Sequence, residues 1–172
     1  RCVILRCCPV NKYKSGHSNM SNIHLDSKGQ THQPETCVSL YWDWQNVRVN
    51  LDQAQGVLNF ASCQGSLIIK KVYAYWRDED PNFEKFLYEL DFDCINVPSY
   101  QKNSVDNKLI ANCKHEVLNN PNISTVILVS GDKDFLGLVR ELKAKSKKII
   151  IFAYQQVSKK LITLADKFYQ IN

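Results

Sequence analysis

Residues 125–135 read TVILVSGDKDF, and this stretch decides the fold. Its first part, 125–129, is apolar and mostly β-branched, as in a central strand of a parallel sheet that is buried on both faces. The next residues, 130–134, are polar and include Asp132 and Asp134. Ligands of parallel α/β sheets bind outside the carboxyl ends of the strands, so this strand end predicts a polar site.

Strand and helix patterns alternate on both sides of this stretch. Apolar runs predict four more strands, at 37–42, 67–76, 93–97 and 148–153. Apolar residues at helical spacing predict helices at 50–62, 82–90, 104–119, 133–145 and from Ser158 through Phe168. We therefore expect an α/β fold of the Rossmann-like, three-layer type. Its parallel sheet has about five strands in the order 3-2-1-4-5, with helices on both faces.

Residues 1–35 differ in composition from the rest of the chain. They are polar, rich in turn formers and without hydrophobic period, so we expect a disordered N-terminal extension followed by one domain at 36–172. Met20 is the only methionine and a candidate for the native start. Most of the net charge of +5 lies before residue 37, so the charge of the domain permits nucleic-acid binding without indicating it.

Several classes of protein are disfavoured by what the sequence lacks. No stretch approaches the roughly 18 uncharged apolar residues of a membrane helix, so no membrane association is expected. The 7 cysteines are scattered without a C-x-x-C pair, which favours reduced thiols in a cytoplasmic protein over a zinc site. Neither G-x-G-x-x-G nor G-x-x-x-x-G-K-[ST] occurs, so no nucleotide cofactor is expected.

Acidic residues follow strands that are neighbours in the predicted order. Asp43 ends the strand at 37–42, Asp132 and Asp134 follow the strand at 125–129, and Asp106 lies in the first turn of a helix that leaves the same edge. Carboxylates packed together repel one another, and a hard divalent cation with oxygen ligands offsets that repulsion. The sequence therefore predicts a site for Mg²⁺ or Mn²⁺ at this edge.

Each acid also has a plain structural explanation. Asp106 in a first turn opposes the helix dipole, with Ser104 as the predicted N-cap, and Asp132 or Asp134 can cap the helix that follows. Asp43 ends a strand and has no cap to make, so it is the hardest of the four to explain in this way. Their joint position at one sheet edge favours a site.

At these residues the sequence resembles the NYN domain family, a branch of the PIN-like nucleases that includes the bacterial LabA-like proteins. The resemblance covers about residues 37–171. It is carried by D-x-x-N at 43–46, Lys102 with Val105-Asp106, S-G-D-x-D-F at 130–135, and Ser158 with Leu161, Ala165-Asp166 and Phe168.

The resemblance implies a metal-dependent ribonuclease that hydrolyses RNA phosphodiester bonds. Asp43, Asp106, Asp132 and Asp134 then form the catalytic and metal-binding set, and Asn46 and Ser130 support the metal or a phosphate. One position departs from the family pattern, since Asn112 stands where a further aspartate is usual, six residues after Asp106. Its amide oxygen can bind a cation but brings no charge.

This departure keeps an alternative open. A catalytically weakened NYN module would bind RNA or a protein partner without cleavage. A small-molecule phosphatase on a similar sheet is disfavoured, because residue 45 is Gln where a second aspartate is needed. The sequence also leaves self-association open.

Cationic and aromatic groups around the acids are candidates to bind RNA. Those nearest the motifs are Arg48, Lys102, Lys108, Lys133 and Trp44. Trp42 and Tyr100 flank the same edge. Taken singly, each lysine is equally well explained as ordinary surface and Trp42 as part of the core.

Overall fold

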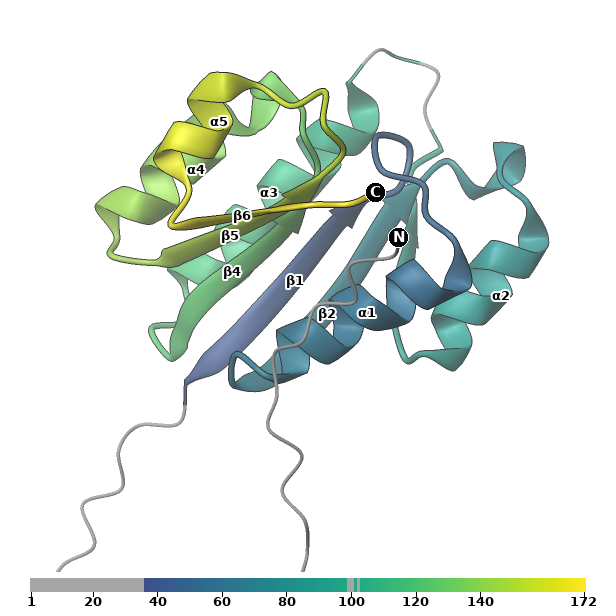
Figure 1. Cartoon of the computed structure of the whole chain (residues 1–172), viewed down its shortest axis with the longest axis horizontal. Helices are drawn as coiled ribbons and strands as arrows, with labels where there is room; N and C mark the ends of the chain where they lie inside the picture. The colour runs from purple at the N-terminus through teal and green to yellow at the C-terminus, as the bar shows by residue number, and fades with distance from the viewer. Residues whose placement is uncertain (1–35, 99–100, 102) are drawn as a thin grey trace, which may run out of the picture.

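The structure, a computed structural model, describes residues 36–98, 101 and 103–172. These residues form an α/β sandwich with helices on both sides of a central parallel sheet (Figure 1). The predictions made for residues 1–35, including the start at Met20, and for Tyr100 and Lys102 lie outside the described residues.

The predicted strand order is confirmed and extended by one strand. The sheet runs β3-β2-β1-β4-β5-β6, and every neighbouring pair is parallel. The strands are β1 (Cys37–Asp43), β2 (Ser66–Ala74), β3 (Asp93–Asn96), β4 (Ile123–Val129), β5 (Lys148–Ala153) and β6 (Lys167–Gln170). Because Trp42 of β1 lies opposite Val129 of β4, the residues that follow these two strands meet at one edge of the sheet.

The sixth strand corrects the prediction for the end of the chain. We expected Phe168 on the last helix, but α5 (Lys159–Leu164) stops earlier, and Phe168 lies in β6 opposite Ile151. Asp166 is the physical reason. Its N–H donates to the Ile149 carbonyl at 2.9 Å, and its Oδ2 accepts from the Ile149 N–H at 2.7 Å. These two hydrogen bonds hold Asp166 against the start of β5 and direct the following residues along the edge of the sheet.

The helices divide between the two faces. α1 (Leu51–Ser62) and α2 (Pro81–Glu89) pack on one face, and α3 (Ser104–Leu118) and α4 (Leu136–Ala144) pack on the other together with α5. Short 3-10 turns, η1 (Trp76–Asp78) and η2 (Lys133–Phe135), follow β2 and β4. None of the helices in the described part of the chain is long and apolar enough to cross a membrane.

The core explains why these elements form. β4 is buried along nearly its whole length, as its apolar sequence predicts, and each flanking helix buries one apolar stripe. Cys113 is a free thiol within this core, and burial raises its pKa.

Candidate metal centre

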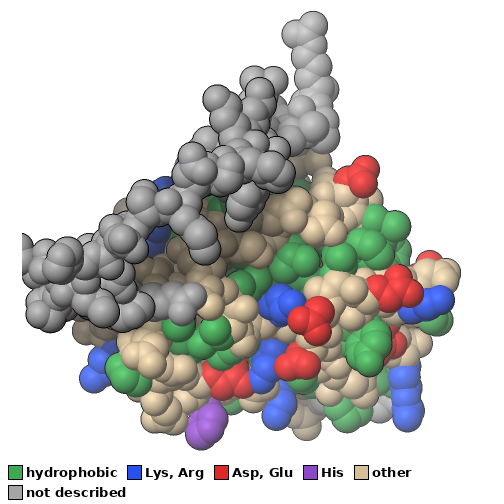
Figure 2. All heavy atoms as spheres, turned by 90° about the horizontal axis from the view of Figure 1, so that it is seen from below, with side chains coloured by type: hydrophobic (Ala, Val, Ile, Leu, Met, Phe, Trp, Pro, Cys, Tyr) green, Lys and Arg blue, Asp and Glu red, His purple; other side chains and the backbone are tan. Residues whose placement is uncertain are grey.

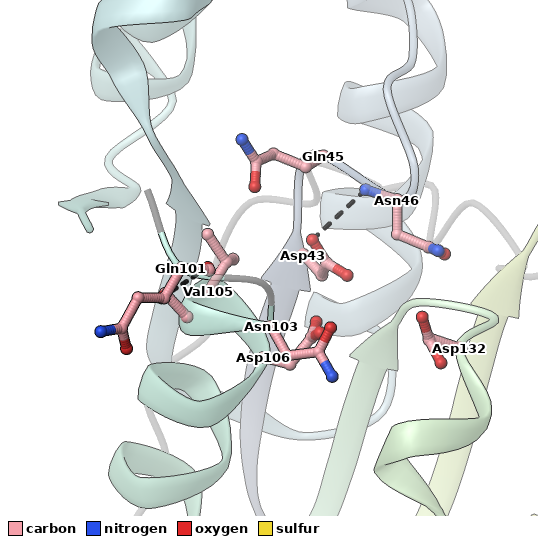
Figure 3. A pocket seen from close by; sticks show the side chains of 9 residues that line it. Asp43, Gln45, Asn46, Gln101, Asn103, Val105, Asp106 and Asp132 are labelled. Carbon is pink, nitrogen blue, oxygen red and sulfur yellow. Dashed lines mark hydrogen bonds between the residues drawn. The ribbon is translucent and has the colours of Figure 1, made fainter. Parts of the chain in front are cut away.

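An acidic hollow of about 330 Å³ lies at the carboxyl ends of β1 and β4. Three segments that are far apart in the sequence supply its walls: the loop after β1, the start of α3 and the segment after β4 (Figure 3). The lining residues are Asp43, Gln45, Asn46, Gln101, Asn103, Ser104, Val105, Asp106 and Asp132. The fold thus places polar groups at the edge where the sequence predicted them.

Three carboxylates meet at the edge of this hollow, and two of them, Asp106 and Asp132, line it. Asp106, Asp132 and Asp134 each offer one oxygen, and these oxygens all lie within 4.8 Å of one another. Octahedral Mg²⁺ holds its ligands at about 2.1 Å, so opposite ligands lie roughly 4.2 Å apart. Neighbouring ligands of such an ion lie only roughly 3.0 Å apart, so the three carboxylates, which span up to 4.8 Å, have to draw closer together when a cation binds. The donor set itself is suited to a hard divalent cation.

Asp43 lies next to this cluster and is buried, with 3% of its surface exposed. Its Oδ1 accepts from the Asn46 N–H and its Oδ2 from the Ser130 hydroxyl, both at 3.3 Å. Burial is the main cause that raises the pKa of Asp43 from 3.8 to about 7, and the charge of Asp106 adds to it, while the two hydrogen bonds oppose the change. Asp43 is thus partly protonated at neutral pH in the metal-free protein.

The pKa of Asp106 is raised as well. Burial contributes most and the charge of Asp132 comes next, while the hydrogen bond with Asp43 lowers this pKa. The two shifts show that the fold holds these acids close together at an electrostatic cost. A bound cation removes that cost, because it favours the ionised form of every carboxyl group around it.

Asp132 can cap a helix and bind a cation at the same time. It is the N-cap of η2, and its Oδ1 accepts from the Asp134 N–H at 2.9 Å. A capping carboxylate keeps a second oxygen and further lone pairs, so capping does not use up its capacity as a ligand. The cap fixes the carboxyl group in the direction of the hollow seen in Figure 3.

Asn103 is a site residue that the sequence analysis missed. It has a left-handed backbone, with φ of 63°, and is the residue before α3, so Ser104 is the first residue of the helix and not its N-cap as predicted. The Asn103 Nδ2 donates to Asp134 Oδ2 at 2.8 Å. Asparagine tolerates this backbone conformation better than most residues, which is the signal that was available.

Asn46 and Ser130 connect the loops that carry the acids. The Asn46 Oδ1 accepts from the Gly131 N–H at 2.9 Å, which links the loop after β1 to the segment after β4. The Ser130 hydroxyl donates to Asp43 and accepts from the Asp132 N–H at 3.3 Å. In the structure both residues support carboxylates directly.

Asn112 lies elsewhere. Its Nδ2 donates to the Tyr73 hydroxyl at 3.1 Å, and it is not among the residues that line the hollow. Six residues of helix separate it from Asp106, a rise of about 9 Å along the axis. The structure therefore does not bring Asn112 to the acidic cluster, contrary to its prediction as a metal ligand.

The candidate RNA-binding residues have different surroundings. Lys108 and Lys133 are exposed near the cluster, and Arg48 is exposed in the loop after β1. Trp44 is only 1% exposed and packs against the rings of Trp42, Trp76 and Phe83, so the prediction that it stacks on RNA is wrong. The turn after β1 directs the Trp44 ring into the core, and the spacing of residues in the sequence does not reveal this direction.

A second hollow, of about 380 Å³, is lined by charges of both signs, Lys70, Lys71, Asp91 and Asp93, and so lacks the purely acidic character of the first. Figure 2 shows the side of the molecule at the amino ends of the strands, where basic and acidic side chains are interspersed. Ion pairs such as Lys70 with Asp91, at 2.6 Å, neutralise part of this surface. The acidic hollow therefore remains the best-supported site.

Gly131 gives a test of how tightly this edge is packed. An added Cβ would lie 3.2 Å from the Cβ of Ala153 and 3.3 Å from that of Val157. We expect Gly131→Ala to lower the free energy of unfolding by about 1–3 kcal/mol through overpacking. Urea unfolding measures this, with Gly137→Ala on α4, which has open space around it, as the control. Equal stabilities of the two variants would contradict the tight packing.

The fold is that of a PIN-like domain. Residues 37–172 match the NYN domain family, and the chain belongs to this family, which is part of the PIN-like nuclease superfamily. A crystal structure of a protein of unknown function from Vibrio parahaemolyticus has the same fold. It shares 24% sequence identity over 83% of this chain and 97% of that chain, with a TM-score of 0.64. Comparison with curated proteins finds no significant match.

Proposed function

We propose that the protein is a metal-dependent ribonuclease that hydrolyses RNA phosphodiester bonds at the acidic hollow. The convergence of the Asp106, Asp132 and Asp134 carboxylates supports this most directly. Membership of the NYN family supports nuclease chemistry in general, and RNA is the substrate that the sequence resemblance implies. Assignment to the LabA-like branch and a cytoplasmic location stay predictions.

In this proposal the four acids divide the work by position. Asp106, Asp132 and Asp134 hold Mg²⁺ or Mn²⁺, and the buried Asp43 beside Asp106 adds negative charge once a bound cation favours its ionised form. When bound, the cation supplies a positive charge that polarises the scissile phosphate and lowers the pKa of the attacking water. Asn46 and Ser130 hold the loops that carry the acids in place through the hydrogen bonds described above.

The substrate has to approach a negatively charged hollow, so basic groups at its rim are needed. Arg48, Lys108 and Lys133 are exposed on the loop after β1, on α3 and on η2, the three segments that bear the acids. We assign them to phosphate contacts. Lys102 stays a prediction for the same role.

The direct test incubates the purified chain with labelled single-stranded RNA in Mn²⁺, in Mg²⁺ or in EDTA. We expect cleavage with either metal and none in EDTA, because without a cation the acids repel the phosphate. A single-stranded DNA of the same sequence is the control for substrate class. Product length on a denaturing gel is the measurement.

The alternative function has its own outcome in this experiment. A module that binds RNA without cleavage is favoured by Asn112, which replaces a carboxylate and bonds to Tyr73. Tight RNA binding with no product in any metal would support this module and contradict the ribonuclease. Absence of both binding and cleavage would contradict the ribonuclease and the RNA-binding module, and would leave a module that binds a protein partner.

A further inference from the structure

We propose that Glu79 is a positioning residue that holds Arg48 at the rim of the acidic hollow for binding a substrate phosphate. The inference rests on the proposed function, since it concerns how the same site binds RNA. Glu79 follows η1, at the same edge of the sheet as Asp43, and nothing in its local sequence distinguishes it from the neighbouring acids.

Glu79 binds Arg48 at two points. Its Oε1 accepts from Arg48 Nη2 at 2.6 Å, and its Oε2 accepts from Arg48 Nε at 2.9 Å. Such a fork fixes the plane of the guanidinium as well as its place. Only 6% of the Glu79 side chain is exposed, while 56% of the Arg48 side chain is. The acid is thus part of the protein interior and the base is presented to solvent.

Trp44 holds the carboxylate from behind. Its Nε1 donates to Glu79 Oε2 at 3.0 Å, and its ring is locked among the rings of Trp42, Trp76 and Phe83. The Glu79 carboxylate is therefore oriented before substrate arrives. This also gives Trp44 a place in the site, through its ring N–H and not by stacking on a base.

Arg48 keeps donors for a ligand. A guanidinium has five N–H groups. Two bonds go to Glu79, and Nη1 donates to the Gln45 carbonyl at 3.1 Å, which leaves two N–H groups unused among the contacts of the described residues. Gln45 lines the hollow, and the pKa of Arg48 is raised chiefly by its hydrogen bond to Glu79 and, to a smaller extent, by the charge of Asp43. An oriented guanidinium with spare donors beside a cation site is suited to a phosphate oxygen.

If Glu79 positions Arg48, removing the Glu79 charge changes RNA affinity in the opposite direction from that expected for a simple change in net charge. Removing the charge of Glu79 makes the rim more positive, which by itself strengthens binding of RNA. If Glu79 instead orients Arg48, the same change weakens RNA binding. Asp78 is the matched control, because it is the neighbouring residue and is exposed, and Asp78→Asn removes an identical charge without touching Arg48.

The experiment compares Glu79→Gln, Asp78→Asn, Arg48→Ala and the double variant Glu79→Gln with Arg48→Ala. All carry Asp132→Asn in the full chain so that RNA stays intact, and fluorescence anisotropy gives the Kd for labelled single-stranded RNA. We expect Glu79→Gln and Arg48→Ala to raise Kd by roughly 5- to 20-fold, as for loss of charged hydrogen bonds, with no further loss in the double variant. Asp78→Asn should leave Kd unchanged or lower it.

Two further measurements separate positioning from general damage. The melting temperature of Glu79→Gln and its Mn²⁺ affinity, measured without Asp132→Asn, should match those of the unmodified chain. A Kd for Glu79→Gln equal to that for Asp78→Asn overturns the inference and leaves the proposed function standing. Loss of Mn²⁺ binding or of the fold in Glu79→Gln also overturns it, because Glu79 is then purely structural. Failure of the parent chain to bind RNA overturns both proposals.

Discussion

Asp132→Asn is expected to reduce metal-dependent RNA cleavage by at least about 100-fold, because it removes one of three carboxylates that meet within 4.8 Å. The fold should survive, since an asparagine oxygen can still cap η2 by accepting the Asp134 N–H. Mn²⁺ binding, measured by calorimetry, should weaken in parallel. Loss of activity without loss of the fold then identifies the carboxylate as functional.

Asp80→Asn is the matched control for this experiment. Asp80 is the N-cap of α2, and its Oδ1 accepts the Asn82 N–H at 2.9 Å, which repeats the capping geometry of Asp132 away from the hollow. Asparagine is an equally good cap, so this variant should keep full activity and Mn²⁺ affinity. Cleavage by Asp132→Asn at more than half the rate of the unmodified chain would show that the cluster does not carry the reaction.

The second large effect is on the stability of the metal-free protein between pH 4 and pH 7. Asp43 has a pKa of about 7 in the folded chain against 3.8 as its ordinary value, so the folded state binds its proton more tightly than the unfolded state does. The contribution of Asp43 to the free energy of unfolding is therefore fully present below pH 4 and is lost as the pH rises to 7. The difference is about 4 kcal/mol at most, at 1.36 kcal/mol per pKa unit. Asp106, whose pKa is also raised, acts with the same sign.

Urea unfolding in EDTA at pH 4, 5.5 and 7 measures this effect, with Asp43→Asn as the comparison. The amide oxygen of this variant can still accept from the Asn46 N–H and the Ser130 hydroxyl, but it does not titrate. We expect Asp43→Asn to exceed the unmodified chain in stability at pH 7 and to match it near pH 4. Saturating Mn²⁺ should reverse this order at pH 7, since a cation stabilises the ionised acids. Parallel pH profiles of the two proteins would contradict the raised pKa.

The parts of the fold that sequence could predict are those with a long apolar period. β4 is a run of seven residues, six of them buried, and its pairing with β1 brings Asp43 and Asp132 to one edge, so the acidic site could be predicted as well. β6 could not, because its four residues, two exposed and two partly buried, fit a helix pattern equally well. What decides their conformation is the pairing of Asp166 with Ile149, a contact across 17 residues.

The supporting residues of the site could not be predicted for a similar reason. Glu79 is set apart from the exposed Asp78 by its burial and by its partners, Arg48 and Trp44, which are more than 30 positions away in the chain. Asn103 acts on Asp134 across 31 positions. Local spacing shows which residues end a strand, but it does not show which loops fold against each other.

The central place of β1 has a consequence for the newly made chain. β1 is synthesised first among the strands, yet one of its two neighbours is β4, which leaves the ribosome roughly eighty residues later. Until then Asp132 and Asp134 do not exist, and Asp106 lacks the two carboxylates that complete the acidic cluster. Incomplete chains that stop before residue 132 therefore lack this cation site, and whatever reaction it supports begins only after residues 132–134 have been added.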